Sequence, residues 1–170
     1  MVSAIISNLK AFILASHKAE RLSIKDAISD LPPVFENQKV ETYELPPQND
    51  YQRLMRHNSS KITCHFCGEY GDKIRTVIKH VKQGQGKADF NLLVEQGVVD
   101  KKYRLTSGYP NTYGRLIENQ PSTTITNNMT TPSGLRCIHY SQDRALTPRE
   151  GARIQSFPDW FEFEGDKVHV

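Results

Sequence analysis

Hydrophobic residues recur with helical spacing over residues 72–83 of this chain. Ile74, Ile78 and Val81 stand at positions i, i+4 and i+7, which places three apolar side chains on one face of a helix. Asp72 is positioned to cap the first turn, and a glycine follows the segment and favours its end. The pattern therefore predicts a helix over residues 72–83.

Capping residues and prolines predict three more helices. Ser23 precedes an apolar segment that a double proline terminates, which indicates a helix near residues 24–30. A second is expected near residues 51–56. Thr147 begins a Thr-x-x-Glu capping box with proline at the first helical position, which predicts a helix over 148–156.

Turn formers dominate the remaining middle of the chain. Gly, Pro and Asn recur between residues 84 and 134, a pattern typical of short strands joined by turns. Together with the four helices, this predicts a mixed α+β fold.

Composition is that of one modest globular unit. The 170 residues are 37% hydrophobic and 24% charged, which allows a core and shows no sign of wholesale disorder. The apolar start, Met1–Ser16, lacks a basic residue before its apolar run and is interrupted by Asn8 and Lys10, unlike a signal peptide. With no apparent membrane segment, we expect a soluble cytoplasmic protein. Three cysteines, an odd number, argue against a disulfide framework.

Positive charge is concentrated in the middle third. Residues 61–115 carry ten basic and five acidic side chains, whereas the net charge of the whole chain is only +3. Arg75, Lys79 and Lys82 repeat the helical spacing beside the apolar face. Such a row is either a solvated helix face or a set of contacts to a polyanion.

The most distinctive segment covers residues 144–161 and reads R-A-L-T-P-R-E-G-A-R-I-Q-S-F-P-D-W-F. It resembles the motif R-x-L-T-x-R-E-x-A-R-x-Q-x-F-P-D-x-F near the C-terminus of bacterial DNA (cytosine-5) methyltransferases, and it matches every fixed position. In that family the motif mainly organises the target-recognition domain against the catalytic domain. The resemblance therefore implies a structural role for five residues, namely Arg144, Thr147, Arg149, Glu150 and Arg153.

Other segments extend the resemblance over most of the chain. Ser23–Pro33 is similar to the T-V-x-D-A-I-x-D-L-P that opens the recognition region of many members. Tyr113–Leu116 and Pro121–Thr126 are similar to their Y-x-R-L and P-A-P-T-I-T-T segments, and residues 133–144 continue the match. The resemblance runs, with gaps, from about residue 22 to residue 163.

The resemblance implies double-stranded DNA as a partner. In the family, a threonine followed by Leu, Ile or Val helps to read the target, and Thr124-Ile125 is the matching pair here. An alternative is that these β-branched residues simply form a strand. The candidate DNA-binding residues are Arg75, Lys79, Lys82, Arg115, Thr124 and Thr126.

Catalytic motifs of the family are not found in this sequence. Its members use an F-x-G-x-G segment for S-adenosylmethionine, a P-C-Q nucleophile loop and an E-N-V segment. Cys64, Cys67 and Cys137 all lack the Pro-Cys context. We therefore assign no catalytic residue and expect no cofactor bound by this chain alone. S-adenosylmethionine would serve the complete enzyme, with the nucleophile on a separate N-terminal catalytic polypeptide.

These features lead to one expected architecture. Residues 1–20 are interpreted as a remnant of the last catalytic-domain strand and linker, 21–143 as a target-recognition domain, and 144–170 as the C-terminal motif, truncated before its final helix. The expected fold is a small strand- and loop-rich α+β recognition domain with short helices, lacking the Rossmann-like catalytic domain. The expected function is the DNA-recognition part of a restriction-modification methyltransferase. Alternatives are a stand-alone DNA-binding module and the inactive product of a truncated gene.

A zinc-binding module is the rival interpretation. Cys64 and Cys67 form a C-x-x-C pair, and Cys137 with His139 could complete a Cys3His site. The long separation between the two pairs is unlike a zinc finger, and C-x-x-C pairs are also found as buried small residues. No metal ligand is therefore assigned.

Overall fold

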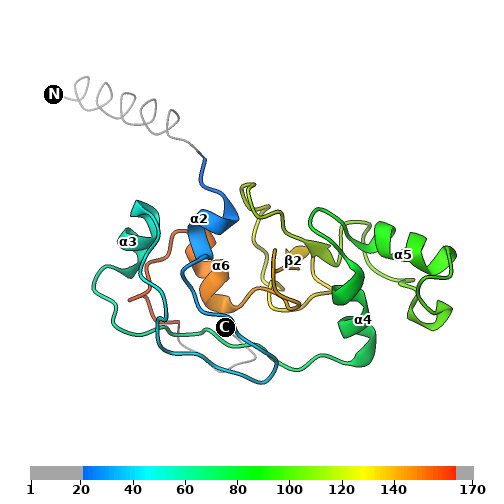
Figure 1. The fold of residues 1–170 in the computed structure, drawn as a ribbon, viewed down its shortest axis with the longest axis horizontal. Coiled ribbons are helices and arrows are strands. Elements are labelled where there is room, and N and C mark those ends of the chain that lie inside the picture. The colour runs from blue at the N-terminus through cyan, green and yellow to red at the C-terminus, as the bar shows by residue number, and fades with distance from the viewer. Residues whose placement is uncertain (1–20, 164–170) are drawn as a thin grey trace.

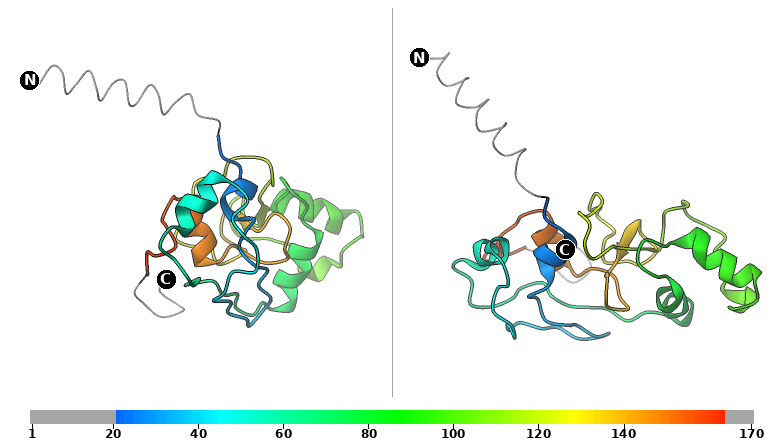
Figure 2. Two further views of the ribbon diagram at one scale, coloured as in Figure 1. Left: turned by 60° about the vertical axis from the view of Figure 1, so that its left-hand side comes forward. Right: turned by 45° about the horizontal axis from the view of Figure 1, so that its top comes forward.

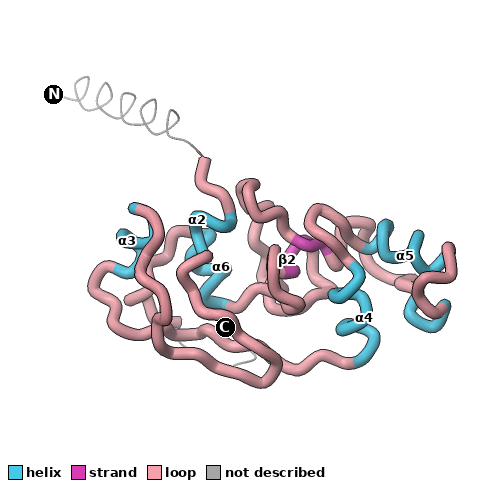
Figure 3. The backbone as a smooth tube through the Cα atoms, in the orientation of Figure 1, coloured by secondary structure: helices cyan, strands magenta, loops and turns pink. Residues whose placement is uncertain are grey.

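The computed structural model describes residues 21–163. Short helices and very short strands are joined by long loops (Figure 3). In chain order the elements are helices α2 (Ile24–Ile28), α3 (Asp50–Arg56), α4 (Asp72–His80) and α5 (Lys87–Glu95), the 3-10 helix η1 (Lys101–Tyr103), strands β1 (Gly114–Arg115) and β2 (Arg136–Ile138), and helix α6 (Pro148–Ile154).

The helices gather at two ends of an elongated molecule. Figure 1 shows α2, α3 and α6 at one end and α4 and α5 at the other, with the strands between them. The same division is visible in both turned views (Figure 2). Because α2 and α6 are far apart in sequence yet pack together, the two ends of the described chain close one core.

A two-stranded parallel sheet connects the two groups of helices. Gly114 pairs with Arg136, and Arg115 pairs with Ile138. A side chain at Gly114 would place its Cβ 2.5 Å from Arg136 Cγ, so glycine permits the close approach of the strands. The described residues contain no other named strand. The expectation of several strands between residues 84 and 134 is therefore wrong.

Three groups of buried apolar residues form the interior. The first joins α2 to residues from distant loops, including Ile62, Leu116 and Leu146. The second lies within α4, α5 and the segment that follows, and the third joins α4 to β2 through Ile78 and Ile138. The two groups of helices are therefore held by separate cores rather than by one central sheet.

The predicted helices occur with altered boundaries. The helix expected over 72–83 ends at His80, and its N-cap is Gly71 rather than Asp72, which occupies the first helical position. Helix α6 begins as predicted, with Pro148 first and Thr147 as N-cap. Helix α5 was missed because glycines flank it on both sides and suggested turns instead.

Residues 1–20 and residues 164–170 lie outside the described part of the chain. The division into segments 1–20, 21–143 and 144–170 therefore stays a prediction. Within the described part of the chain, no helix is long and apolar enough to cross a membrane.

Candidate nucleic-acid interface and its buried ionic support

A reciprocal capping box fixes the start of α6. Thr147 Oγ1 accepts a hydrogen bond from the Glu150 backbone N–H at 3.2 Å, and Glu150 Oε2 accepts one from the Thr147 N–H at 2.8 Å. The Thr147 hydroxyl also lies 2.9 Å from Nδ1 of buried His65, whose Nε2 lies 2.9 Å from the Pro32 carbonyl. Since a carbonyl only accepts, His65 carries its proton on Nε2 and Thr147 donates to Nδ1.

Glu150 also forms a buried ion pair with Arg144. The guanidinium donates in a bidentate arrangement, with N–O distances of 2.7 and 2.6 Å. Burial alone would raise the pKa of Glu150, but the charge of Arg144 and its hydrogen bonds hold that pKa below its usual value. Glu150 therefore remains a carboxylate in the interior and supports both the helix cap and Arg144.

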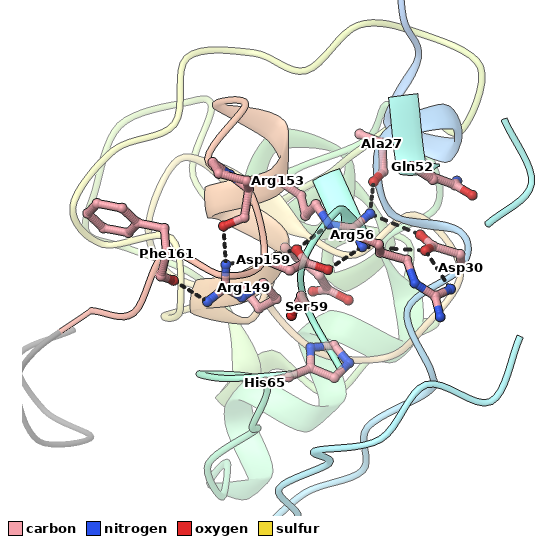
Figure 4. A network of polar contacts seen from close by, with 12 residues as sticks. Ala27, Asp30, Gln52, Arg56, Ser59, His65, Arg149, Arg153, Asp159 and Phe161 are labelled. Atoms are coloured by element: carbon pink, nitrogen blue, oxygen red, sulfur yellow. Dashed lines mark hydrogen bonds and ion pairs between the residues drawn. The ribbon is translucent and has the colours of Figure 1, made fainter. Parts of the chain in front are cut away.

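Arg153 joins α6 to α2 through a second buried network (Figure 4). Its guanidinium contacts both carboxylate oxygens of Asp159 at 2.5 and 2.6 Å. The same group donates to Asp30 Oδ1 and to the Ala27 carbonyl, each at 3.1 Å. Asp30 is further paired with Arg56 of α3 at 3.3 Å. One arginine thus connects three helices and the segment that follows α6.

Arg149 is equally buried and binds mainly backbone. It donates to the Thr63 carbonyl at 3.0 Å and to the Phe161 carbonyl at 2.8 Å, as Figure 4 partly shows. The Thr63 hydroxyl also accepts from it. All five residues assigned a structural role, Arg144, Thr147, Arg149, Glu150 and Arg153, are at most 2% exposed. This geometry is what a structural role requires.

His139 completes the ionic cluster in its neutral form. Its Nδ1 accepts backbone N–H groups of Ser141 and Gln142, each at 3.1 Å, so the proton lies on Nε2, which is 3.6 Å from a Glu150 oxygen. Burial lowers the pKa of His139 to about 4, despite the opposing effect of Glu150.

Arg115 lies in the interior and is not a surface residue, which corrects its assignment to DNA contact. It is 7% exposed. Its guanidinium donates to the Ile78 and Val81 carbonyls at the end of α4, both at 2.7 Å, and to Asp143 at 2.7 Å. Further bonds reach carbonyls of the loop after β2. Because all its donors are satisfied internally, Arg115 holds the end of α4 against the loop that follows β2 and has none left for DNA.

Two lysines remain exposed at the end of α4 and just after it. Lys79 and Lys82 are exposed, and neither is in an ion pair among the described residues. Arg75, one turn earlier, is instead paired with Glu36 at 2.7 Å and Glu69 at 3.3 Å. The basic row predicted from sequence is thus divided into a neutralised arginine and two available lysines.

Two more lysines lie on the segment that packs against α4. Lys101 and Lys102 form η1, which contacts both α4 and α5. Both are exposed. They lie outside the predicted DNA-binding residues, although they are adjacent and belong to the basic third of the chain.

The threonine segment lies on another part of the molecule. Thr124 and Thr126 belong to a loop and not to a strand, so the alternative interpretation as a β-strand is wrong. Ile125 between them packs against the core that contains α2, whereas α4 contributes to the other two cores. The structure therefore separates the threonines from the lysines.

Zinc ligands are not assembled in the described part of the chain. No group of three His, Cys, Asp or Glu side chains there could hold a metal ion. Cys67 donates to the Gly68 carbonyl at 3.3 Å and lies 3.5 Å from the Tyr70 hydroxyl, and Cys137 donates to the Thr131 carbonyl at 3.0 Å. Burial raises the pKa of both thiols, that of Cys137 to about 12, so both are protonated near neutral pH.

The described residues do not fit S-adenosylmethionine. Its family site needs a glycine-containing turn directly after a strand. Leu116-Ile117-Glu118 follow β1, and His139-Tyr140-Ser141 follow β2. Neither strand leads into such a turn, so these two strands do not provide the family's binding site for S-adenosylmethionine.

Comparison with known proteins identifies the family. The model of the family described as C-5 cytosine-specific DNA methylase matches residues 5–170. The chain belongs to this family. DNA (cytosine-5)-methyltransferase 4 of Arabidopsis thaliana is 31% identical over 87% of this chain and 11% of its own length. Type II methyltransferases are also similar: M.AgeI of Thalassovita gelatinovora is 29% identical, covering 86% of this chain and 45% of its own.

A solved structure shares the fold. It is a prophage-encoded E. coli protein described as a DNA modification methyltransferase, with a TM-score of 0.55 and 20% identity. The match covers 89% of this chain and 41% of that protein. The chain thus spans less than half the length of these relatives.

These matches correct two expectations. The family's methylase model covers nearly the whole chain, so its interpretation as a separate C-terminal recognition domain is wrong. The expected fold class is also wrong, because the structural match is to a methyltransferase and not to a recognition domain that lacks the Rossmann-like catalytic fold. The assignment to the cytosine-5 DNA methyltransferase family is confirmed.

Proposed function

We propose that this chain is part of a DNA (cytosine-5) methyltransferase of the restriction-modification type and contacts double-stranded DNA in the cytoplasm. The observation that carries the proposal is the match of the methylase family over residues 5–170. The similarity to type II methyltransferases supports the restriction-modification assignment.

Two exposed lysines, one on α4 and one just after it, supply the phosphate contacts in this proposal. Lys79 and Lys82 carry positive charge without an ion-pair partner among the described residues, and such side chains bind phosphates irrespective of base sequence. Thr124 and Thr126 offer hydroxyl and methyl groups for base contacts. Arg115 is left out because its guanidinium is satisfied internally.

Methyl transfer by this chain alone is not expected. The buried thiols of Cys67 and Cys137 have raised pKa values, the opposite of what an attacking thiolate needs. Cys64 lies in Thr-Cys-His and lacks the Pro-Cys context of the family. The nucleophile and S-adenosylmethionine would come from a separate N-terminal polypeptide.

The first test measures transfer of a radiolabelled methyl group from S-adenosylmethionine to cytosine-containing duplex DNA. The purified chain is assayed alone and together with the protein encoded immediately upstream. We expect label in DNA only in the mixture. Label transferred by the chain alone would contradict its incompleteness, and no label in either reaction would contradict the proposed two-part enzyme.

A second test separates phosphate contacts from structural charges. Replacing Lys79 and Lys82 by Ala should weaken duplex binding on all sequences alike and reduce the slope of log affinity against log salt by about 2. Arg75→Ala, which removes a charge already paired with Glu36, is the matched control and should change the slope much less. Equal effects of the two variants would contradict the assignment. Thr124→Ala should instead alter the preference between sequences.

A further inference from the structure

One glycine of α6 has no backbone reason to be a glycine. Gly151 lies inside the helix and is buried. Positive φ angles occur among the described glycines at Gly84, Gly97 and Gly108, but not at this position. Glycine is one of the least favourable residues in the interior of a helix, because it loses the most backbone freedom on folding. The reason for Gly151 is therefore expected in its surroundings.

The side chain of Met129 supplies that reason. A Cβ at position 151 would overlap Met129 Sδ and would lie only 2.7 Å from Met129 Cε. The end of the methionine side chain therefore occupies the space that any other residue at position 151 would fill. Pro148, Ala152 and Phe157 line an apolar cleft of about 60 Å³ beside the same side chain. The thioether thus lies on an apolar surface of α6.

Met129 belongs to a segment that is folded tightly on itself. Its N–H donates to the Thr126 carbonyl at 3.2 Å, which closes a first turn. The Thr131 N–H donates to the Asn128 carbonyl at 3.1 Å and closes a second turn. A Cβ at Gly134 would lie 2.7 Å from the Asn128 carbonyl oxygen, so the chain closes around a glycine. The segment is therefore one compact loop.

The two halves of this loop, residues 126–134, are attached to different elements. The second half lies against the sheet, because the Cys137 thiol of β2 donates to the Thr131 carbonyl at 3.0 Å. The first half begins at Thr126 and contacts α6 through Met129. The contact between Met129 and the helix therefore fixes the position of the half that contains Thr126.

We propose that Met129 is a positioning residue for DNA recognition, which holds the 126–134 loop on α6 and thereby places Thr126 against the bases. The inference rests on the proposed function, in which threonines of this region make base contacts. A group that distinguishes bases must be held to within about 0.5 Å, whereas phosphate contacts carry no sequence information. Displacement of Met129 should therefore reduce discrimination between sequences and leave the overall affinity for DNA nearly unchanged.

The test uses the full chain and the substitution Gly151→Ala, which fills the space of the Met129 side-chain end. The variant should fold, because alanine favours a helix and the end of a methionine side chain is flexible. Hydrogen exchange is measured by mass spectrometry in peptides from the 126–134 loop and from α2. We expect exchange to become about tenfold faster in the loop and to stay unchanged in α2.

Gly68→Ala is the matched control. It is the same substitution at a glycine whose added Cβ meets nothing within 4 Å and whose φ is not positive. Exchange in the 126–134 loop should therefore remain at the wild-type rate.

The effect on DNA recognition is measured with a pool of duplexes that carry randomised base pairs. The bound fraction is sequenced for each variant. Wild type and Gly68→Ala should enrich preferred sequences at least about tenfold over the pool average, and Gly151→Ala less than about threefold. Affinity for the unselected pool should stay within about twofold, because Lys79 and Lys82 are unchanged.

Met129→Ala removes the same contact from the side of the loop. It should match Gly151→Ala in loop exchange and in sequence enrichment. The double variant should be no worse than either single variant, because one contact cannot be lost twice. Additive losses in the double variant would trace to separate effects on the helix and the loop, and would overturn the assignment.

Failure of this inference is distinguishable from failure of the proposed function. Wild-type loop exchange and enrichment in Gly151→Ala would overturn the positioning role while DNA binding remained. Faster loop exchange with unchanged enrichment would also overturn it, because the position of the loop would not determine the sequence that is read. If no variant binds the pool, the proposed function fails, and the exchange rates alone decide whether Met129 holds the loop.

Discussion

Basic side chains of this protein differ in whether they are buried or exposed. Arg144, Arg149 and Arg153 are almost completely buried, whereas Lys79 and Lys82 are exposed. A buried charge must be paired and hydrogen-bonded, because desolvation otherwise costs several kcal/mol. The three arginines satisfy this condition through Glu150, Asp159 and backbone carbonyls. The motif therefore acts through its internal contacts.

Glu150→Gln should strongly destabilise the fold. The amide can still cap α6 as the third residue of the capping box, but it leaves Arg144 as an uncompensated buried charge. We expect the free energy of unfolding, measured by urea titration at pH 7, to fall by about 3–5 kcal/mol.

The matched control breaks an exposed ion pair. Glu162→Gln removes the partner of Lys61, whose ion pair has side chains 61% and 65% exposed, and should cost at most about 1 kcal/mol. Similar losses in the two variants would show that the Arg144 pair is not the source of the effect.

Because His139 is neutral in the folded protein, we expect the fold to lose stability in mild acid. Its pKa is about 4 in the folded protein and 6.5 in the unfolded chain, so the unfolded chain binds the extra proton between these values. Stability is therefore fully present above pH 6.5 and falls as the pH drops toward 4. We expect His139 to account for about 2 kcal/mol of the loss between pH 7 and pH 5.

Urea unfolding at several pH values in this window measures the effect. His139→Asn keeps a side-chain acceptor for the Ser141 and Gln142 amides and should flatten the pH dependence. His57→Asn, at an exposed position, should leave it unchanged. The lower window, below the ordinary pKa of 4.5, belongs to Glu150, whose pKa is depressed in the folded protein. An unchanged slope in His139→Asn would reject the assignment.

At the scale of elements, local signals fixed helix starts better than helix ends. Thr147 and Ser23 are N-caps of α6 and α2 with complete capping boxes, and both starts were predictable because a cap is a contact within four residues. The end of α4 at His80 was not predictable in this way. Arg115, 34 residues away in sequence, binds the Val81 carbonyl at the end of that helix. Helix α5 depends on Phe90 and Val94 entering a core whose other members lie on α4 and on residues 99–105.

Phe90→Ala should destabilise the α4–α5 end selectively. Phe90 is fully buried in the second core, and truncation of such a residue costs about 3–5 kcal/mol. Hydrogen exchange should therefore accelerate at the amides of α5 and η1 more than at those of α2 and α6. Leu92→Ala, on the same helix but 53% exposed, is the control. Uniform acceleration across all helices would indicate a single cooperative core instead.

At the scale of the whole molecule, the chain is a part of a methyltransferase fold with two differently built ends. The α2–α6 end contains the buried arginines and a cavity of about 420 Å³, and the α4–α5 end carries the exposed lysines. Arg115 and the short parallel sheet join them. Changes in DNA affinity and changes in stability should thus arise from different residues.

The amino-acid sequence alone determined the family resemblance and the capped starts of α2 and α6. These features depend on residue order and on contacts within one or two turns. Tertiary structure decided which charges are available to a ligand. Arg153 meets Asp30 across 123 residues and Arg115 meets Ile78 across 37. Burial and pairing of a charge depend on such long-range contacts. A buried arginine therefore cannot be distinguished from an exposed one by the sequence alone.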